Sequence, residues 1–80
     1  MKYGFSDEQF DEILSVLRDF PEVEKAVLFG SRAIGTWKEA SDVDIAIYGE
    51  KADSFVAARL KDCFEEETYL PFFFDIIAFK

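Results

Sequence analysis

The fold is decided by residues 25–48, which read KAVLFGSRAIGTWKEASDVDIAIY. Residues 25–29 form a short, largely apolar run that ends at Gly30, and residues 43–48 form a second run that ends at Gly49. Short apolar runs that stop at a glycine are typical of buried β-strands. We therefore predict two strands, separated by a turn or short helix that begins at Gly30.

Amphipathic segments flank the two strands. Residues 6–9, SDEQ, form a capping box, and the apolar residues that follow recur at helical spacing as far as Pro21, which disfavours a continued helix. Between Asp53 and Glu67 apolar residues recur again with the helical period, with Asp53 or Ser54 as the N-cap. We therefore predict one long helix before the first strand and another after the second strand in the sequence.

Residues 72–79, FFFDIIAF, predict a third strand. This run follows Pro71 and is too rich in aromatic and β-branched residues to favour a helix of that length. The predicted order is helix, strand, turn or short helix, strand, helix, strand. We expect an α/β (α+β) domain with a small mixed sheet of at least three strands. Its helices should pack on one face of the sheet, with acidic residues at one edge of the other face.

The composition is that of one packed globule. The chain has 80 residues, of which 50% are hydrophobic and 18% aromatic, so we expect residues 1–80 to form a single domain around one core. Cys63 is the only cysteine and there is no histidine, which excludes an internal disulfide framework and a Cys/His zinc site. These features favour a cytoplasmic location.

Charge and hydropathy limit the expected partners. Seventeen acidic and nine basic residues give a net charge of -8, which disfavours binding to the polyanionic backbone of nucleic acids. No apolar run approaches the ~20 residues that a membrane span requires, and the first residues signal neither export nor insertion. We therefore expect neither a nucleic-acid partner nor a membrane partner.

Three aspartates lie where a carboxylate is costly. Asp42 and Asp44 bracket Val43 at the start of the second strand, and because side chains alternate along a strand they should point to the same face, about 7 Å apart at Cα. Like charges at that spacing raise each other's pKa unless a cation lies between them. Asp75 stands within the run at residues 72–79, which contains no basic residue. Each aspartate alone also fits a simpler interpretation, a solvent-facing strand start or an edge strand.

Gly30, Ser31 and Arg32 follow the first strand directly. A glycine lets the backbone approach an anion closely, while a serine hydroxyl and the amides of a helix N-terminus bind phosphate oxygens. Arg32 could add a charged fork to a phosphate, although the three residues alone also fit an ordinary turn with a solvated arginine. Ten residues separate Ser31 from Asp42, so a phosphate-binding turn precedes a hard-cation site, as a Mg²⁺-triphosphate requires.

These patterns resemble a known signature. Residues 30–35, GSRAIG, and residues 41–46, SDVDIA, are similar to the G-S-x10-D-x-D motif of the DNA polymerase β-like nucleotidyltransferase superfamily, and specifically of its minimal nucleotidyltransferases, MNT. Residues 70–77, LPFFFDII, resemble the strand that carries the third carboxylate of that family. The resemblance implies an enzyme that moves a nucleotidyl group from a nucleoside triphosphate to an acceptor.

The resemblance also assigns a role to each candidate residue. It implies that Asp42 and Asp44 ligate or share the Mg²⁺ ions of a two-metal site. Asp75 would be the third metal ligand and the acid nearest the acceptor hydroxyl. Gly30 and Ser31 would hold the triphosphate, with ATP as the expected substrate. All three aspartates are therefore candidate catalytic residues.

The sequence departs from the family pattern at two places. Ile34 stands where many relatives carry a second basic residue, which removes one expected phosphate or acceptor contact. The chain also stops five residues after Asp75, whereas relatives usually continue through about another helix and strand. We therefore expect the domain to be C-terminally shortened relative to its relatives, at the cost of acceptor or partner contacts.

A protein is the expected acceptor, because the length leaves no room for a dedicated tRNA- or polynucleotide-binding domain. Minimal nucleotidyltransferases are commonly encoded beside HEPN-domain proteins and act as antitoxins, some by adenylylating a tyrosine of the partner. The resemblance thus implies a HEPN-domain partner. The alternative is a non-catalytic antitoxin that binds nucleotide and partner. A plain Ca²⁺ or Mg²⁺ binding domain ranks last, because it gives no reason for the glycine-serine turn.

Several other residues are assigned structural roles. Trp37 and Lys38 lie between the two halves of the signature, where an anchored aromatic ring and a solvated lysine are the favoured interpretation. Cys63 falls on the apolar stripe of the second long helix and is interpreted as a small core residue. Phe73 shares the face of Asp75, whereas its two phenylalanine neighbours should pack in the core.

Overall fold

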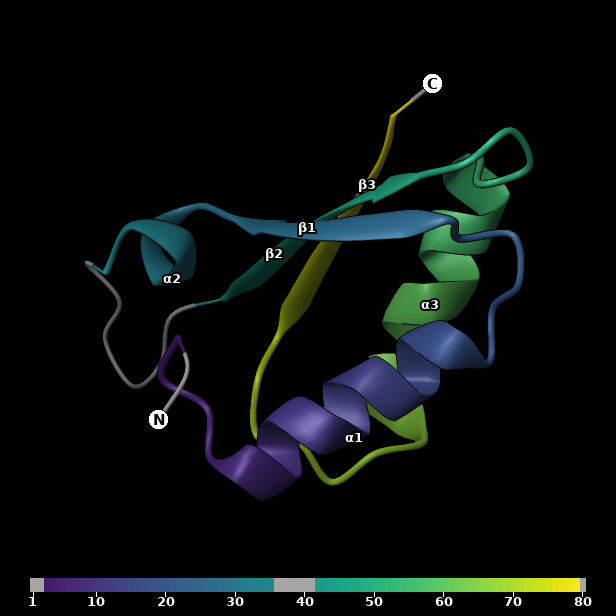
Figure 1. Cartoon of the computed structure of the whole chain (residues 1–80). Helices are drawn as coiled ribbons and strands as arrows, with labels where there is room; N and C mark the ends of the chain where they lie inside the picture. Colours follow the sequence, from purple (N-terminus) through teal and green to yellow (C-terminus); the bar gives the residue numbers. More distant parts are fainter. Residues whose placement is uncertain (1–2, 36–41, 80) are drawn as a thin grey trace.

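The computed structural model describes residues 3–35 and 42–79. Its elements are α1 (Asp7–Arg18), β1 (Lys25–Phe29), α2 (Ser31–Ile34), β2 (Val43–Tyr48), α3 (Ser54–Glu66) and β3 (Phe74–Phe79). The sheet has the order β1-β2-β3, with β1 antiparallel and β3 parallel to β2. Helices α1 and α3 lie together on one face of this sheet (Figure 1). The predicted small mixed α/β domain is therefore confirmed.

Both long helices begin with the caps that the sequence predicts. The Ser6 side chain accepts a hydrogen bond from the Gln9 amide at 3.1 Å, and the Gln9 side chain accepts one from the Ser6 amide at 2.9 Å. Helix α1 ends at Arg18, ahead of the proline expected to close it. The Asp53 carboxylate accepts from the Val56 amide at 3.0 Å, so Asp53 is the N-cap of α3.

The third strand is shorter than predicted. It begins at Phe74 instead of at residue 72, because the parallel register pairs Phe74 with Val43, the first residue of β2. The Val43 amide donates to the Phe73 carbonyl at 2.9 Å just before the ladder starts. Phe72 and Phe73 therefore approach the sheet without belonging to β3.

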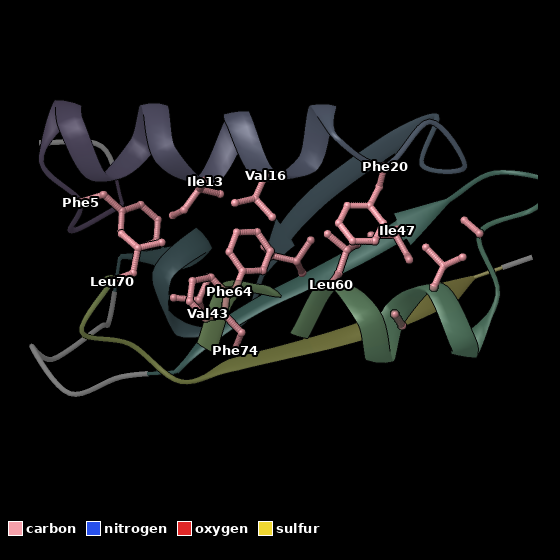
Figure 2. Close-up of a cluster of buried hydrophobic side chains, with 14 residues drawn as sticks. Phe5, Ile13, Val16, Phe20, Val43, Ile47, Leu60, Phe64, Leu70 and Phe74 are labelled. Atoms are coloured by element: carbon pink, nitrogen blue, oxygen red, sulfur yellow. The ribbon is translucent and has the colours of Figure 1, made fainter. Parts of the chain in front are cut away.

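The core lies between the sheet and the two long helices. Figure 2 shows Phe64 of α3 close to Phe74 of β3, and their rings stack with centroids 4.2 Å apart and planes 5° from parallel. The inward-facing residues of β2 complete this layer together with apolar side chains from α1, and the central buried set is Ile13, Val16, Val43, Ile45, Ile47, Leu60, Phe64 and Phe74. Strand alternation thus places every second residue of β2 in the core.

The other face of the sheet carries the remaining side chains. Cross-strand neighbours share a face, so the register forms three rows: Phe29, Asp44 and Asp75; Val27, Ala46 and Ile77; Lys25, Tyr48 and Phe79. The carboxylates occupy the row beside α2. Within residues 3–35 and 42–79, no helix combines the length and apolar character needed to cross a membrane.

Candidate functional site

Asp44 and Asp75 are direct partners in the parallel ladder between β2 and β3. Neighbouring strands lie about 4.8 Å apart, so the two carboxylates stand side by side on the open face of the sheet. Asp44 is half-buried and Asp75 is exposed. Pairing of β2 with β3 therefore brings together two acids that lie 31 positions apart in the sequence.

Asp42 adds a third negative charge to this pair. It is an exposed residue immediately before β2 and lies two positions ahead of Asp44. Burial, the charge of Asp75 and the charge of Asp42 all raise the pKa of Asp44. The three predicted aspartates therefore share one electrostatic neighbourhood in which the ionised form of Asp44 is disfavoured.

Gly30 lies where the acidic row, which we define as Asp44 and Asp75 with the adjacent Asp42, meets the turn after β1. Its φ of 74° is unfavourable for residues with a side chain, and a Cβ at this position would lie 2.3 Å from Oδ2 of Asp44. Phe29, the preceding residue, is the register partner of Asp44. The glycine is thus required by the close approach of Asp44 as well as by the turn itself. The sequence predicts Gly30 as the end of the first strand and as a phosphate-binding residue, but it does not predict this close approach of Asp44.

Ser31 begins the single turn of α2 next to Gly30. The amides of Ala33 and Ile34 donate to the Gly30 carbonyl at 3.1 and 3.3 Å, which closes the turn. Gly35 follows in the left-handed conformation with φ of 83°. The two halves of the sequence signature, the turn and the acidic strand, therefore meet at the end of β1.

Arg32 is buried in this structure instead of facing solvent. Arg32 is 1% exposed. Among residues 3–35 and 42–79 it is the only polar or charged residue that is buried. The guanidinium lies 4.8 Å from the ring of Phe5 and 4.7 Å from the ring of Phe72, and its NH1 donates to the Tyr3 carbonyl at 3.0 Å. A planar, weakly hydrated guanidinium packs favourably against aromatic rings. The Arg32 guanidinium, which the sequence suggests as a phosphate ligand, therefore points into the interior in this structure.

The acidic row has the donor chemistry of a divalent-cation site. Carboxylate oxygens are the ligands that Mg²⁺ prefers, and a cation would relieve the repulsion that raises the pKa of Asp44. Across residues 3–35 and 42–79, no group of three or more His, Cys, Asp or Glu side chains is already arranged around a common point for a metal ion. The carboxylates of Asp42, Asp44 and Asp75 are suitable ligands for Mg²⁺. The side chains of the exposed Asp42 and Asp75 would have to turn toward the ion to bind it.

The residues assigned structural roles fall into two groups. Trp37 and Lys38 lie outside the described residues. Cys63 is half-buried against the core, and burial together with the nearby Glu67 raises the pKa of its thiol, which keeps it protonated. Phe72 and Phe74 pack inward as predicted, whereas Phe73 is exposed and does not pack in the core.

Comparison with known proteins agrees with this arrangement. The family model described as Polymerase beta, Nucleotidyltransferase matches residues 11–79, which include the turn and all three aspartates. The chain belongs to this family. Its members generally use a nucleoside triphosphate and a divalent metal, so the coarse assignment as a nucleotidyltransferase domain follows from membership.

A solved structure supports the fold. A Sulfolobus solfataricus protein described as a nucleotidyltransferase is similar to this chain with a TM-score of 0.55 and 25% sequence identity. The match covers 86% of this chain and 63% of the other, so the domain spans less than two thirds of that protein's length. No curated protein matches the chain significantly.

Proposed function

We propose that this nucleotidyltransferase domain transfers AMP from ATP to a hydroxyl group in a Mg²⁺-dependent reaction. The observation that carries the proposal is the position of Asp44, which lies beside Asp75 across the ladder and against Gly30 of the turn. Asp44 thus lies beside both parts of a site that could bind a metal-triphosphate, namely hard oxygen ligands for the metal and a turn that accommodates phosphate oxygens.

Each part of the site has a proposed task. Gly30 and Ser31 would bind the triphosphate, and Asp42 and Asp44 would hold the metal. Asp75 would complete the ligand set and lie nearest the acceptor hydroxyl. When bound, Mg²⁺ would supply charge neutralisation on the phosphate oxygens and lower the pKa of the attacking hydroxyl.

The proposed acceptor is a hydroxyl on a HEPN-domain protein, with the chain acting as its antitoxin. The resemblance to minimal nucleotidyltransferases supports this partner, and the net charge of -8 disfavours a nucleic-acid acceptor. Co-expression with a HEPN-domain protein encoded beside this chain should give one peak on gel filtration, and separate elution would contradict the partnership.

Calorimetry tests nucleotide binding directly. We expect the folded protein to release or absorb heat when titrated with ATP and Mg²⁺, and to bind ATP much more weakly when the metal is chelated. Asp42→Asn should weaken Mg²⁺-ATP binding because it removes a hard ligand. Asp62→Asn is the matched control, an exposed aspartate on α3 with no place in the site. Absence of any heat with folded wild-type protein would rule out the proposed site.

The second candidate function is a non-catalytic antitoxin that binds nucleotide and partner. Two observations favour it: the aspartates do not already converge on one point within the described residues, and Ile34, which is 75% exposed, replaces a basic residue of the family pattern. Transfer of labelled AMP to a co-purified HEPN-domain partner distinguishes the two functions. Labelling supports the enzyme, whereas stable complex formation without labelling supports the binding module.

A further inference from the structure

Among the described residues, two segments that are distant from Arg32 in the sequence contact its side chain. Its guanidinium lies 4.8 Å from the ring of Phe5 and 4.7 Å from the ring of Phe72, beside a ring pair that contacts edge to face with centroids 5.3 Å apart. The Tyr3 carbonyl accepts a hydrogen bond from NH1. We call Arg32, Phe5 and Phe72 the Arg32 cluster. It connects α2 to the chain before α1 and to the chain before β3.

This cluster anchors an element that has little stability of its own. Helix α2 contains four residues, which is a single turn, and an isolated turn is unstable because its nucleation is costly. Gly30 and Ser31 precede Arg32 directly, so the position of the guanidinium limits where the turn can lie. The approach of Asp44 to Gly30 allows little displacement before the two collide.

The chemistry of the cluster is specific to arginine. A planar, weakly hydrated guanidinium can contact aromatic rings while its N–H groups donate hydrogen bonds, whereas a lysine ammonium is a compact, strongly hydrated charge. Burial lowers the pKa of Arg32, which reflects the cost of removing its charge from water. The Tyr3 carbonyl and the two rings thus hold the guanidinium in the interior, which fixes the position of Arg32 relative to these segments.

We propose that Arg32 is a positioning residue, which holds the turn at Gly30 and Ser31 against Asp44 in the geometry that receives the triphosphate, without contacting a phosphate itself. This proposal rests on the proposed function, since it assigns a support to the same site. It also gives residues 3–5 and Phe72, which lie outside the sequence signature, a part in nucleotide binding.

The test separates positioning from direct contact. Arg32→Lys keeps the positive charge but loses the stacked plane, and Phe72→Leu removes one ring while leaving Arg32 intact. We expect each to weaken Mg²⁺-ATP binding by about tenfold, which corresponds to ~1.4 kcal/mol. Arg59→Lys is the matched control, because Arg59 also stacks on a ring, Phe20, at 5.1 Å but lies away from the turn. The control should bind Mg²⁺-ATP as the wild type does.

A direct phosphate contact by Arg32 predicts a different pattern. Phe72→Leu would then bind as tightly as the wild type or more tightly, because the guanidinium would be freer to turn outward, and that result would overturn the proposal. Phe72 is half-buried, so its leucine variant should remain folded even if Arg32→Lys does not.

Amide resonances give a readout that does not depend on nucleotide. In the metal-free protein, Arg32→Lys and Phe72→Leu should shift the ¹⁵N-¹H signals of Gly30 and Ser31, while Arg59→Lys should leave them in place. If wild-type protein fails to bind Mg²⁺-ATP but these shifts occur, the proposed function fails and the anchoring of the turn stands. If the signals of Gly30 and Ser31 do not respond in either variant, the positioning role is wrong.

Discussion

The two faces of β2 make opposite contributions to stability. Val43, Ile45 and Ile47 point toward the helices and are 0 to 3% exposed, so each contributes apolar burial. Asp44 points the other way, where burial and the charges of Asp42 and Asp75 raise its pKa. In this six-residue strand, side chains that stabilise the folded state therefore alternate with Asp44, whose ionised form destabilises it. The difference indicates that the core face offsets the cost of the acidic row on the open face.

This comparison makes the two faces separable by mutation. Substitutions on the core face should lower the free energy of unfolding, and those in the acidic row should change nucleotide chemistry with little loss of stability. The turn at Gly30 lies where the acidic row meets β1, so substitutions there should affect both the free energy of unfolding and nucleotide binding.

Phe64→Ala tests the core face. Phe64 is fully buried and stacks on Phe74, so its truncation should cost about 3–5 kcal/mol. A domain of this size has a total stability of roughly 4–12 kcal/mol, so the variant should melt far below the wild type or fail to fold. Urea or thermal melts measure the loss. Phe55→Ala on the same helix, where the side chain is 69% exposed, is the control and should change stability by about 0.5 kcal/mol or less. Equal losses in both variants would contradict the assigned core.

Gly30→Ala tests the junction of the two faces. The added Cβ would meet Oδ2 of Asp44, and the positive φ is strained for alanine, so we expect a loss of about 1–3 kcal/mol together with weaker Mg²⁺-ATP binding. The collision and the strain can be separated in an Asp44→Ala background, which removes the carboxylate. Gly30→Ala should cost less stability there than in the wild type. The same cost in both backgrounds would mean that Asp44 does not approach the turn.

Local signals in the sequence were sufficient for most of the fold. The capping box at Ser6 and the cap at Asp53 predict both helix starts, and the glycines after each apolar run predict the first two strand ends. These features could be predicted because each depends on residues within a few positions of one another. The start of β3 could not, since it depends on where its parallel partner β2 begins.

The candidate site was predictable in its members but not in their surroundings. The motif spacing identifies the turn and the aspartates, yet it contains nothing about the ring of Phe5 or that of Phe72. Arg32 meets those rings only after the chain has folded, and its partner carbonyl at Tyr3 lies 29 positions away. A solvent-facing arginine and a buried one look alike in the sequence, so the inward turn of Arg32 required the tertiary structure.

Asp44→Asn has the smallest expected effect on stability. The raised pKa of Asp44 means that its protonated form is favoured in the folded state, so its contribution is present at low pH and is lost as pH rises above the usual value of 3.8. An asparagine is neutral at every pH. In the metal-free protein the variant should therefore match the wild type in acid, and at neutral pH it should melt at the same or a higher temperature. Thermal melts across this pH range, with metal chelated, measure the difference.

The same substitution should reduce nucleotidyl transfer strongly, because it removes a hard ligand where charge must be neutralised in the transition state. We expect a loss on the order of a hundredfold in the rate of AMP labelling of a HEPN-domain partner. Asp62→Asn on α3 serves again as the control and should change neither melting nor labelling. Stability and activity should thus move in different directions at Asp44, the reverse of their joint fall in a core variant such as Phe64→Ala. If Asp44 had a structural role, such as capping the strand, its asparagine variant would melt several degrees lower and still label the partner at the wild-type rate. That combination would remove Asp44 from the catalytic site and, with it, the separation of the two faces.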